Sequence, residues 1–308
     1  MLYSKKPYKI GLSHKTFKNG AETIGFFKTI QNNLKRSSKY SVEFIDLDRF
    51  DDYKDVEFDL MITFSYFPEN PIPDGTYSGY VHSNRSQLYR QKTENLKFKN
   101  ILYIESPICY DLLGSQFRIN LNSIYFYKNQ LPDLISESNR SKLRQVQKSE
   151  QGDDILILLQ NPLQYFINMT IKEYGDYINN IIRKVREKTD KKLIVRYKPG
   201  RNYDFNIVDP LNNLEVSNRD FIEDCQRSYK CIAHSTNAVS TCVYYGLDIV
   251  SLSEYNLAYE FSEKGFDDIN TYNNVDYSAL KKRILSCAYG LPDLASDTFS
   301  ELVSEICD

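Results

Sequence analysis

The stretch that decides the fold runs from 193 to 253 and reads LIVRYKPG, a polar insert, and then YKCIAHSTNAVSTCVYYGLDIVSLS. Its apolar runs at 193–195 and 231–233 predict two buried strands, each followed at once by polar residues. Small residues over 238–245 predict a helix, and Gly246 stands where a C′ glycine ends one. A third strand begins at 249. The stretch therefore predicts alternating strands and helices, the pattern of a parallel α/β sheet.

Polar side chains follow both predicted strands, with Arg196 and Lys198 after the first and the run His234–Asn237 after the second. In parallel α/β sheets the carboxyl ends of the strands bind the ligand. A guanidinium and an ammonium suit phosphate oxygens, and Ser235 or Thr236 is expected to cap the helix whose free N–H groups face a diphosphate. The alternative is an ordinary capped helix beside a solvated strand end.

The same alternation occurs throughout the chain, which predicts two Rossmann-like domains whose parallel sheets face a cleft. We place an N-terminal domain at 1–150 and a C-terminal domain at 151–308, joined near 148–153, with the last helix crossing back to the first domain. Strands are predicted at 8–12, 42–45, 60–64, 101–104, 118–127 and 155–159. Helices are predicted at 22–34, 86–95, 171–188, 218–227, 254–264, 277–287 and 296–306.

Composition narrows the class of protein. The chain has 308 residues, 41% of them hydrophobic, and a net charge of −2, so it can bury real cores and has no overall basic field for nucleic acid. Its six cysteines form no CxxC pair, and we expect reduced core thiols, not disulfides or a zinc site. No apolar run is long enough to span a bilayer, and we expect a cytoplasmic protein.

Four further residues follow predicted strands and are candidates for chemistry. His14 and Glu105, in the first half, are candidate general bases, since a positioned imidazole or carboxylate can accept a hydroxyl proton. Gln160 is an amide at the expected cleft that can bind a base or sugar, and Glu254 can hold a ribose diol. Each also has an ordinary explanation: a loop histidine, a turn-capping carboxylate, a turn amide and a charged helix surface.

Several chemistries lack their sequence signatures here. There is no GxGxxG after a strand, no Walker A sequence, no HExxH, no nucleophile elbow and no zinc-deaminase motif. The triplet Asp46-Leu47-Asp48 has the DxD form of metal-binding loops, but it precedes an acidic run typical of surface. We therefore expect no metal site and no bound cofactor.

The string IVRYKPG…YKCIAHSTNAVSTCVYYGLDIVSLSE resembles the C-terminal half of GT-B glycosyltransferases, most of all the capsule-polysaccharide type and a related bacteriophage group. Those proteins typically have a strand ending in Arg-x-His-Pro, and here Arg196-Tyr197-Lys198-Pro199 has lysine for histidine. The His234-Ser235-Thr236 run matches well, and Gly246–Val250 matches loosely. The resemblance covers about the second half of the chain, and RINLNSIYFYKNQLPD also looks like a phage-group segment.

The resemblance implies a glycosyltransferase with a nucleotide-sugar donor, expected to be UDP-linked, in the C-terminal domain. The donor diphosphate would lie against Arg196, Lys198 and the run His234–Asn237, with Gln160 and Glu254 on its base or sugar. The ExxxxxxxE pair of many retaining members is absent around Glu254, which favours inversion, with a base from the N-terminal half.

The acceptor is predicted as a hydroxymethylated pyrimidine in phage DNA or a capsule or lipopolysaccharide glycan. Binding to DNA would need a basic face, for which the candidates are Lys15, Lys18, Arg85, Arg90 and Lys92. Two alternatives stay open: a nucleotide-sugar-binding protein that has lost catalysis, and a sugar-nucleotide epimerase of the same architecture, which needs no acceptor.

Overall fold

The fold is that of a computed structural model. It describes residues 6–14, 21–64, 92–107, 117–123, 128–129, 131–132, 152–160, 162, 167, 169–198 and 204–308. For residues 14, 21–24, 64 and 105–107 it describes the backbone alone. The predicted helix at 86–95 lies mostly outside these ranges, as do Cys109 and most of the expected linker at 148–153, so the domain boundary stays a prediction.

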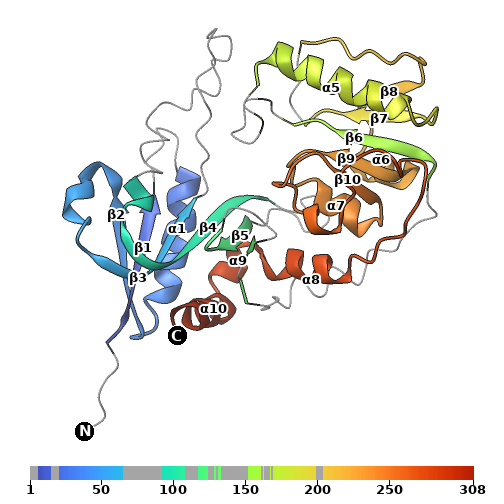
Figure 1. Ribbon diagram of the computed structural model, residues 1–308. Helices are drawn as coiled ribbons and strands as arrows, with labels where there is room; N and C mark the ends of the chain where they lie inside the picture. Colours follow the sequence, from blue (N-terminus) through green and yellow to red (C-terminus); the bar gives the residue numbers. More distant parts are fainter. Residues whose placement is uncertain are drawn as a thin grey trace.

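The first sheet has the strand order β11-β5-β4-β3-β1-β2 (Figure 1). Strands β1 to β4 pair in parallel, whereas β5 pairs antiparallel with both β4 and β11. Its first elements are β1 Tyr8–His14, α1 Ala21–Leu34, β2 Tyr40–Asp46, the 3-10 helix η1 Leu47–Asp52, β3 Glu57–Phe64, β4 Lys97–Pro107 and β5 Phe117–Leu121. The antiparallel strands at one edge make this a mixed sheet.

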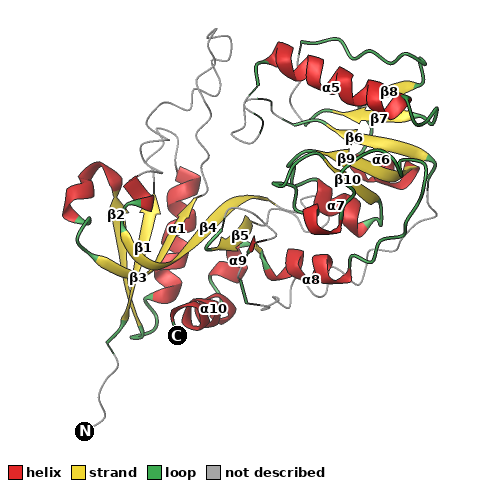
Figure 2. Cartoon of the chain, viewed as in Figure 1, coloured by secondary structure: helices red, strands yellow, loops and turns green. Residues whose placement is uncertain are grey.

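The second sheet is parallel throughout, in the order β10-β9-β6-β7-β8. Its elements are β6 Asp154–Leu158, α5 Ile171–Arg186, β7 Leu193–Arg196, β8 Leu214–Ser217, α6 Phe221–Arg227, β9 Ser228–Ala233, α7 Val239–Tyr244, β10 Asp248–Ser251, η3 Tyr259–Phe261 and α8 Ser278–Ser286. Figure 2 shows α5 on one face of this sheet and α7 on the other. The predicted fold class, an α/β chain with two parallel-strand sheets, is confirmed.

The C-terminal segment leaves the second sheet and packs on the first. It consists of β11 Ala288–Tyr289, α9 Leu291–Leu294 and α10 Asp297–Cys307. Tyr289, Phe299 and Leu302 are buried in the same core as the inward residues of α1 and β1. The Asn33 side chain on α1 donates hydrogen bonds to the carbonyls of Leu294 and Ser296, at 2.9 and 2.8 Å. The end of the chain therefore packs against the first sheet and completes its hydrophobic core (Figure 1).

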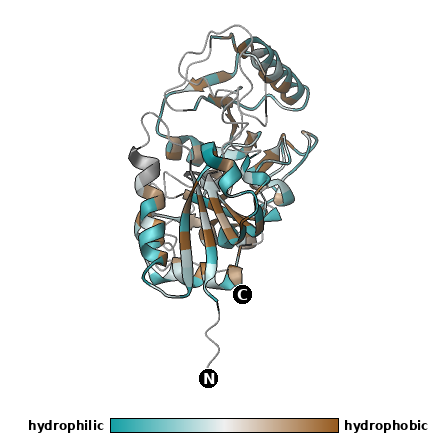
Figure 3. Cartoon of the chain, turned by 90° about the vertical axis from the view of Figure 1, so that its left-hand side faces the viewer, coloured by the Kyte–Doolittle hydropathy of each residue, from teal (hydrophilic) through white to brown (hydrophobic). Residues whose placement is uncertain are grey.

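Alternation along the strands divides the core of the second sheet between its two faces. Ile155 and Ile157 pack towards α5, whereas Leu156 and Leu158 pack with the residues of α6, α7 and α8. Successive strand residues point to opposite faces, so a run of five apolar residues fits a strand covered on both sides. Figure 3 shows brown, hydrophobic stretches along the strands, while helices carry both colours.

Local sequence signals explain where the helices begin and end. Thr170 and Glu173 form a capping box at the start of α5, whose buried face includes Ile178 and Ile182. Gly246 has a φ of 73° after α7, and Leu247 N–H donates to the Cys242 carbonyl at 3.0 Å. This Schellman arrangement confirms the predicted C′ glycine.

Two predictions about the elements of the second half are wrong. A helix was expected over 254–264, but the structure has turns and the three-residue η3. Glu263 instead lies beside β10, where its N–H donates to the Ile249 carbonyl and its carbonyl accepts from Ser251 N–H. Its carboxylate accepts a 2.6 Å bond from the buried Lys230 ammonium. Strand β8 was missed, because its four residues lie in what reads as a polar insert.

Candidate functional site

The candidate site lies where the chain order of the second sheet reverses. From β6 the chain moves to β7 and β8 on one side, and it later returns to β9 and β10 on the other. The register pairs Leu158 with both Ala233 and Arg196, so the residues after β6, β7 and β9 share one edge. In open α/β sheets ligands bind outside the carboxyl ends at such a switch point. Here that point lies between Gln160 and His234.

Gln160 and Ser235 close this edge with two hydrogen bonds between the ends of β6 and β9. Ser235 N–H donates to Gln160 Oε1 at 2.8 Å, and Gln160 Nε2 donates to Ser235 Oγ at 2.7 Å. The Gln160 backbone N–H donates to the Tyr174 hydroxyl on α5 at 3.0 Å. Gln160 is buried. Both atoms of its amide are thus held by Ser235, and the predicted contact with a base or sugar stays a prediction.

His234 lies between Ser235 and an aromatic side chain of α5. Its Nδ1 is 3.1 Å from Ser235 Oγ, and the Tyr177 ring meets it edge to face with centroids 6.4 Å apart. Burial lowers the pKa of His234 from 6.5 to about 4 and raises the pKa of Tyr177 to about 12. At this pKa the imidazole is neutral at pH 7, so it can take part in hydrogen bonds but carries no charge.

The turn before α7 differs from the expectation that Ser235 or Thr236 caps the helix. The N-cap is Ala238, with no side-chain cap bond, and α7 has six residues. Thr236 Oγ1 instead accepts from Ala238 N–H at 3.3 Å, within the turn. The capping prediction is wrong, because the N-cap position lies three residues after the serine, at Ala238.

Asn237 joins this turn to the first sheet. Its Oδ1 accepts a 2.8 Å bond from Nη1 of Arg118, a buried residue of β5. Burial lowers the pKa of Arg118 to about 10, a value that leaves the guanidinium charged at neutral pH. This hydrogen bond connects the turn after His234 to the first sheet.

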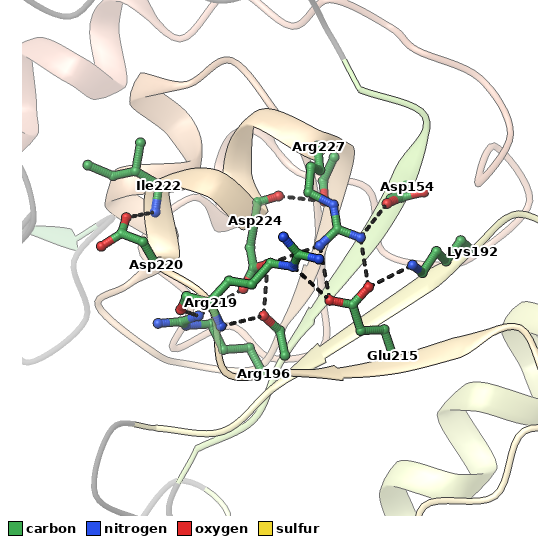
Figure 4. A network of polar contacts seen from close by, with 11 residues as sticks. Asp154, Lys192, Arg196, Glu215, Arg219, Asp220, Ile222, Asp224 and Arg227 are labelled. Atoms are coloured by element: carbon green, nitrogen blue, oxygen red, sulfur yellow. Dashed lines mark hydrogen bonds and ion pairs between the residues drawn. The ribbon is translucent and has the colours of Figure 1, made fainter.

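Arg196, the predicted phosphate clamp, takes part in an ion pair. Its Nη1 donates to Asp224 Oδ2 at 2.8 Å and to the Arg219 carbonyl at 2.6 Å (Figure 4). Its guanidinium lies over the Phe221 ring, 5.2 Å from the ring centroid. Asp224 is fully buried. The Arg196 charge is therefore balanced within the protein. Lys198, two residues on, is exposed at the same edge.

The ion-pair network continues along α6 and β8 (Figure 4). Glu215 accepts from Arg227 Nη2 at 2.8 Å and is paired with Lys192 at 2.6 Å. Hydrogen bonds from Arg227 and then from Lys192 hold the pKa of Glu215 well below its usual range. Through Arg227 the network joins the end of α6 to strands β6 and β8, which is a structural role.

His14 and Glu105 lie near the ends of two strands of the first sheet. His14 ends β1 and Glu105 lies on β4, with β3 between them. The register pairs Ser13 with Thr63 and Thr63 with Tyr103, so both candidate bases reach the carboxyl edge of these parallel strands. Strands are about 4.8 Å apart, which separates the two backbones by about 10 Å. Their side chains lie outside the described residues, and their catalytic roles stay predictions.

The remaining predicted features lie away from this hydrogen-bonded group or outside the described residues. Glu254 is exposed in the turn after β10. Within the described ranges, no group of three or more His, Cys, Asp or Glu residues is arranged to hold a metal ion. No helix in the part of the chain that the structure describes is long and apolar enough to cross a membrane. Of the five basic candidates for a DNA-binding face, only Lys92 is described, and its ammonium donates to the Leu47 carbonyl at 2.7 Å.

Sequence reasoning missed three residues at or beside the site: Tyr174, Tyr177 and Arg118. The two tyrosines belong to the helix face that was predicted to pack on the sheet, and helical spacing does not separate a core aromatic from one at a strand end. Arg118 lies inside a predicted strand. The alternation of apolar and polar residues there indicates which face of the sheet a side chain lies on, but not that its partner is Asn237 in the other half of the chain.

The comparisons with known proteins bear on the fold. No family model matches the sequence, and no curated protein matches it. Two structures of KpsC from Thermosulfurimonas dismutans do match. The beta Kdo 2,7 transferase has a TM-score of 0.50 and 7% identity, over 96% of this chain and 99% of that one. The beta Kdo 2,4 transferase has a TM-score of 0.50 and 8% identity, over 92% of this chain and 90% of that one. The chain therefore has a GT-B glycosyltransferase-like fold.

Proposed function

We propose that this protein is a glycosyltransferase that moves a sugar from a nucleotide-sugar donor to an acceptor hydroxyl. The observation that carries the proposal is the hydrogen-bonded group Gln160, His234 and Ser235 at the switch point of a GT-B-like fold, where α/β sheets bind their ligands. The likeness to the Kdo transferases extends over nearly the whole chain, which supports a role for both sheets.

The donor would bind at the carboxyl edge of the second sheet. When the sugar is transferred, the bond to its anomeric carbon breaks and negative charge develops on the departing nucleotide phosphate. An N–H of the neutral His234 ring and the exposed Lys198 ammonium are the groups for that charge. We leave Arg196 out of this role, because Asp224 balances its charge. A UDP-linked donor remains part of the proposal.

The acceptor would bind at the carboxyl edge of the first sheet. His14 or Glu105 would take the proton of the acceptor hydroxyl as its oxygen attacks the anomeric carbon, in a single displacement that inverts the configuration and uses no metal. The Arg118–Asn237 hydrogen bond supports this arrangement, since it ties the first sheet to the turn that follows His234.

For the acceptor we propose a glycan of the capsule or lipopolysaccharide type, in line with the Kdo transferases that share the fold. Phage DNA is the other prediction from the sequence. DNA binding loses affinity steeply as salt rises, because counterions are released from the phosphates. Measuring binding to duplex DNA at two salt concentrations therefore decides between them: a steep, salt-dependent affinity would replace the glycan by DNA.

The test of the function is release of nucleotide that depends on an acceptor. Full-length protein would be incubated with UDP-, CMP-, GDP-, ADP- and dTDP-sugars and with glycan or DNA acceptors. We expect one donor to turn over, and the variant Lys198→Ala to lose at least about tenfold, or about 1.4 kcal/mol of transition-state binding. Lys188→Ala is the matched control, since Lys188 is another exposed lysine, paired with Asp267. Nucleotide binding without turnover of any donor would favour a non-catalytic binding protein, and turnover without an acceptor would favour an epimerase.

A further inference from the structure

Gln160 has a buried amide whose orientation is fixed by the chemistry of its partner. The Ser235 backbone N–H can only donate, so the Gln160 atom 2.8 Å away must be the accepting Oε1. The other amide atom is then Nε2, which can only donate, and it lies 2.7 Å from Ser235 Oγ. The assignment follows from the two contacts together and does not depend on distinguishing oxygen from nitrogen by eye.

This orientation determines what the Ser235 hydroxyl does. Its oxygen accepts from Gln160 Nε2, and its own hydrogen needs an acceptor. Within the described residues the one other side-chain atom in hydrogen-bond contact with Oγ is His234 Nδ1, at 3.1 Å. With Oγ accepting from Gln160 Nε2, the hydroxyl is placed to donate to Nδ1, which then carries a lone pair. A neutral imidazole with a lone pair on Nδ1 carries its proton on Nε2.

We propose that Gln160 is a positioning residue, not a ligand contact: through Ser235 it holds His234 in the Nε2–H tautomer, so that the ring presents one N–H to an oxygen acceptor of the ligand. That N–H makes no hydrogen bond to any other residue the structure describes, and the ring is partly exposed. The ligand group it suits is an acceptor-only oxygen, such as that of a phosphate. The tautomer stands on geometry alone, whereas the phosphate rests on the proposed function.

The low pKa of His234 agrees with this arrangement, since a neutral ring at pH 7 has a defined tautomer. The backbone contact of Gln160 serves the same end. Its N–H is held by the Tyr174 hydroxyl at 3.0 Å, which fixes the start of the side chain against α5. Tyr177, one turn further along α5, packs its ring on the imidazole. The relay from Gln160 through Ser235 to His234 is thus supported by contacts at the ends of β6 and β9 and from α5.

The test reads the tautomer directly, in ligand-free, full-length protein labelled with ¹⁵N. The chain has three histidines, so long-range ¹H–¹⁵N spectra contain few ring signals, and His234→Asn identifies the one in question. We expect the Nδ1 signal of a nitrogen with a hydrogen-bonded lone pair and the Nε2 signal of a protonated nitrogen. A protonated Nδ1 in the wild type would overturn the proposal.

Gln160→Glu is expected to reverse the relay. A carboxylate can only accept, so it still takes the Ser235 N–H but now also takes the hydroxyl hydrogen. Oγ is left as an acceptor, and Nδ1 gains a proton. Retention of the wild-type pattern in a folded Gln160→Glu protein would overturn the proposal.

Should that variant not fold, Ser235→Ala and Ser235→Thr give the same decision. Alanine removes the donor, and the Nδ1 signal should move towards that of a free lone pair, whereas threonine keeps the hydroxyl and should keep the signal. An unchanged Nδ1 signal in Ser235→Ala would show that no hydroxyl donates to it.

The second part of the proposal, that the Nε2–H group of His234 binds a phosphate oxygen, is tested by adding UDP, CMP and inorganic phosphate to the same sample. A shift of the His234 Nε2 signal with any of them supports the phosphate role. If the tautomer is as proposed but none of these probes moves Nε2, the positioning role of Gln160 stands, and the phosphate ligand, with the proposed donor site, is refuted.

Discussion

Acid should destabilise this protein through His234 in a way that a single substitution removes. Burial lowers the pKa of the ring from 6.5 to about 4, so between these values the unfolded chain binds a proton that the folded protein does not. Stability is then fully present above about pH 6.5 and is lost as pH falls towards 4. A pKa difference of one corresponds to 1.36 kcal/mol, so the loss in the free energy of unfolding is at most about 3 kcal/mol.

The magnitude can be worked out for two convenient conditions. From about pH 7.5 to about pH 5 the linkage relation gives close to 2 kcal/mol for this pair of pKa values. Because the ring is partly exposed, we expect an observed loss of about 1–2 kcal/mol. The assay is urea unfolding of the wild type and of His234→Asn at both pH values. Asparagine does not titrate, and the other two histidines are present in both proteins, so their contributions cancel.

The difference between the two proteins is the quantity to measure. The wild type should lose about 1–2 kcal/mol more than His234→Asn on going to the lower pH. Equal losses would refute the buried, neutral state of His234, and a larger loss in the variant would mean that the ring is charged and paired in the folded protein.

Three substitutions, two of them with a matched control, test the packing of the fold by the urea midpoint. Asp224→Asn should cost about 3–5 kcal/mol, because it leaves a guanidinium without its buried counter-charge, whereas Asp267→Asn, on an exposed pair, should cost under about 1 kcal/mol. Gly152→Ala should cost about 3 kcal/mol or more, since a Cβ there would lie 1.8 Å from a backbone carbonyl oxygen at the end of α6; Gly25→Ala, with open space around it, should cost nothing. Gly246→Ala should cost about 1–2 kcal/mol, because its φ is 73°. Equal midpoints within either matched pair, or an unchanged midpoint for Gly246→Ala, would contradict these assignments.

Local signals in the sequence predicted most of the helices and strands, because residues close together in the chain determine where these begin and end. The apolar run at 155–159 became β6, and the apolar spacing after Thr170 became α5 with its capping box. The glycine after α7 was recognised because only a left-handed residue closes that helix end. The edge that gathers Gln160 and Ser235 also followed from strand order, since polar residues after parallel strands meet at one edge.

The roles of single side chains were harder to predict, because they depend on partners distant in sequence. The sequence suggests a phosphate clamp at Arg196, and the structure adds a partner that the sequence does not reveal, the buried carboxylate of Asp224, 28 residues away. The sequence suggests a ligand contact at Gln160, and the structure shows what the sequence does not, that both atoms of its amide bind Ser235, 75 residues away. Glu263 read as part of a helix because spacing does not reveal the buried ammonium of Lys230. Pairings of this kind are tertiary, and a single sequence carries no signal for them.

The most direct test of the donor site is thermal stabilisation by UDP, GDP, CMP, ADP and dTDP, in the wild type and in His234→Asn. One nucleotide at a hundred times its dissociation constant should stabilise the wild type by roughly 2.7 kcal/mol. The variant, which lacks the ring N–H, should lose most of that stabilisation at the same concentration. Stabilisation by no nucleotide, or equal stabilisation of both proteins, would contradict a nucleotide-sugar site at the junction of β6 and β9.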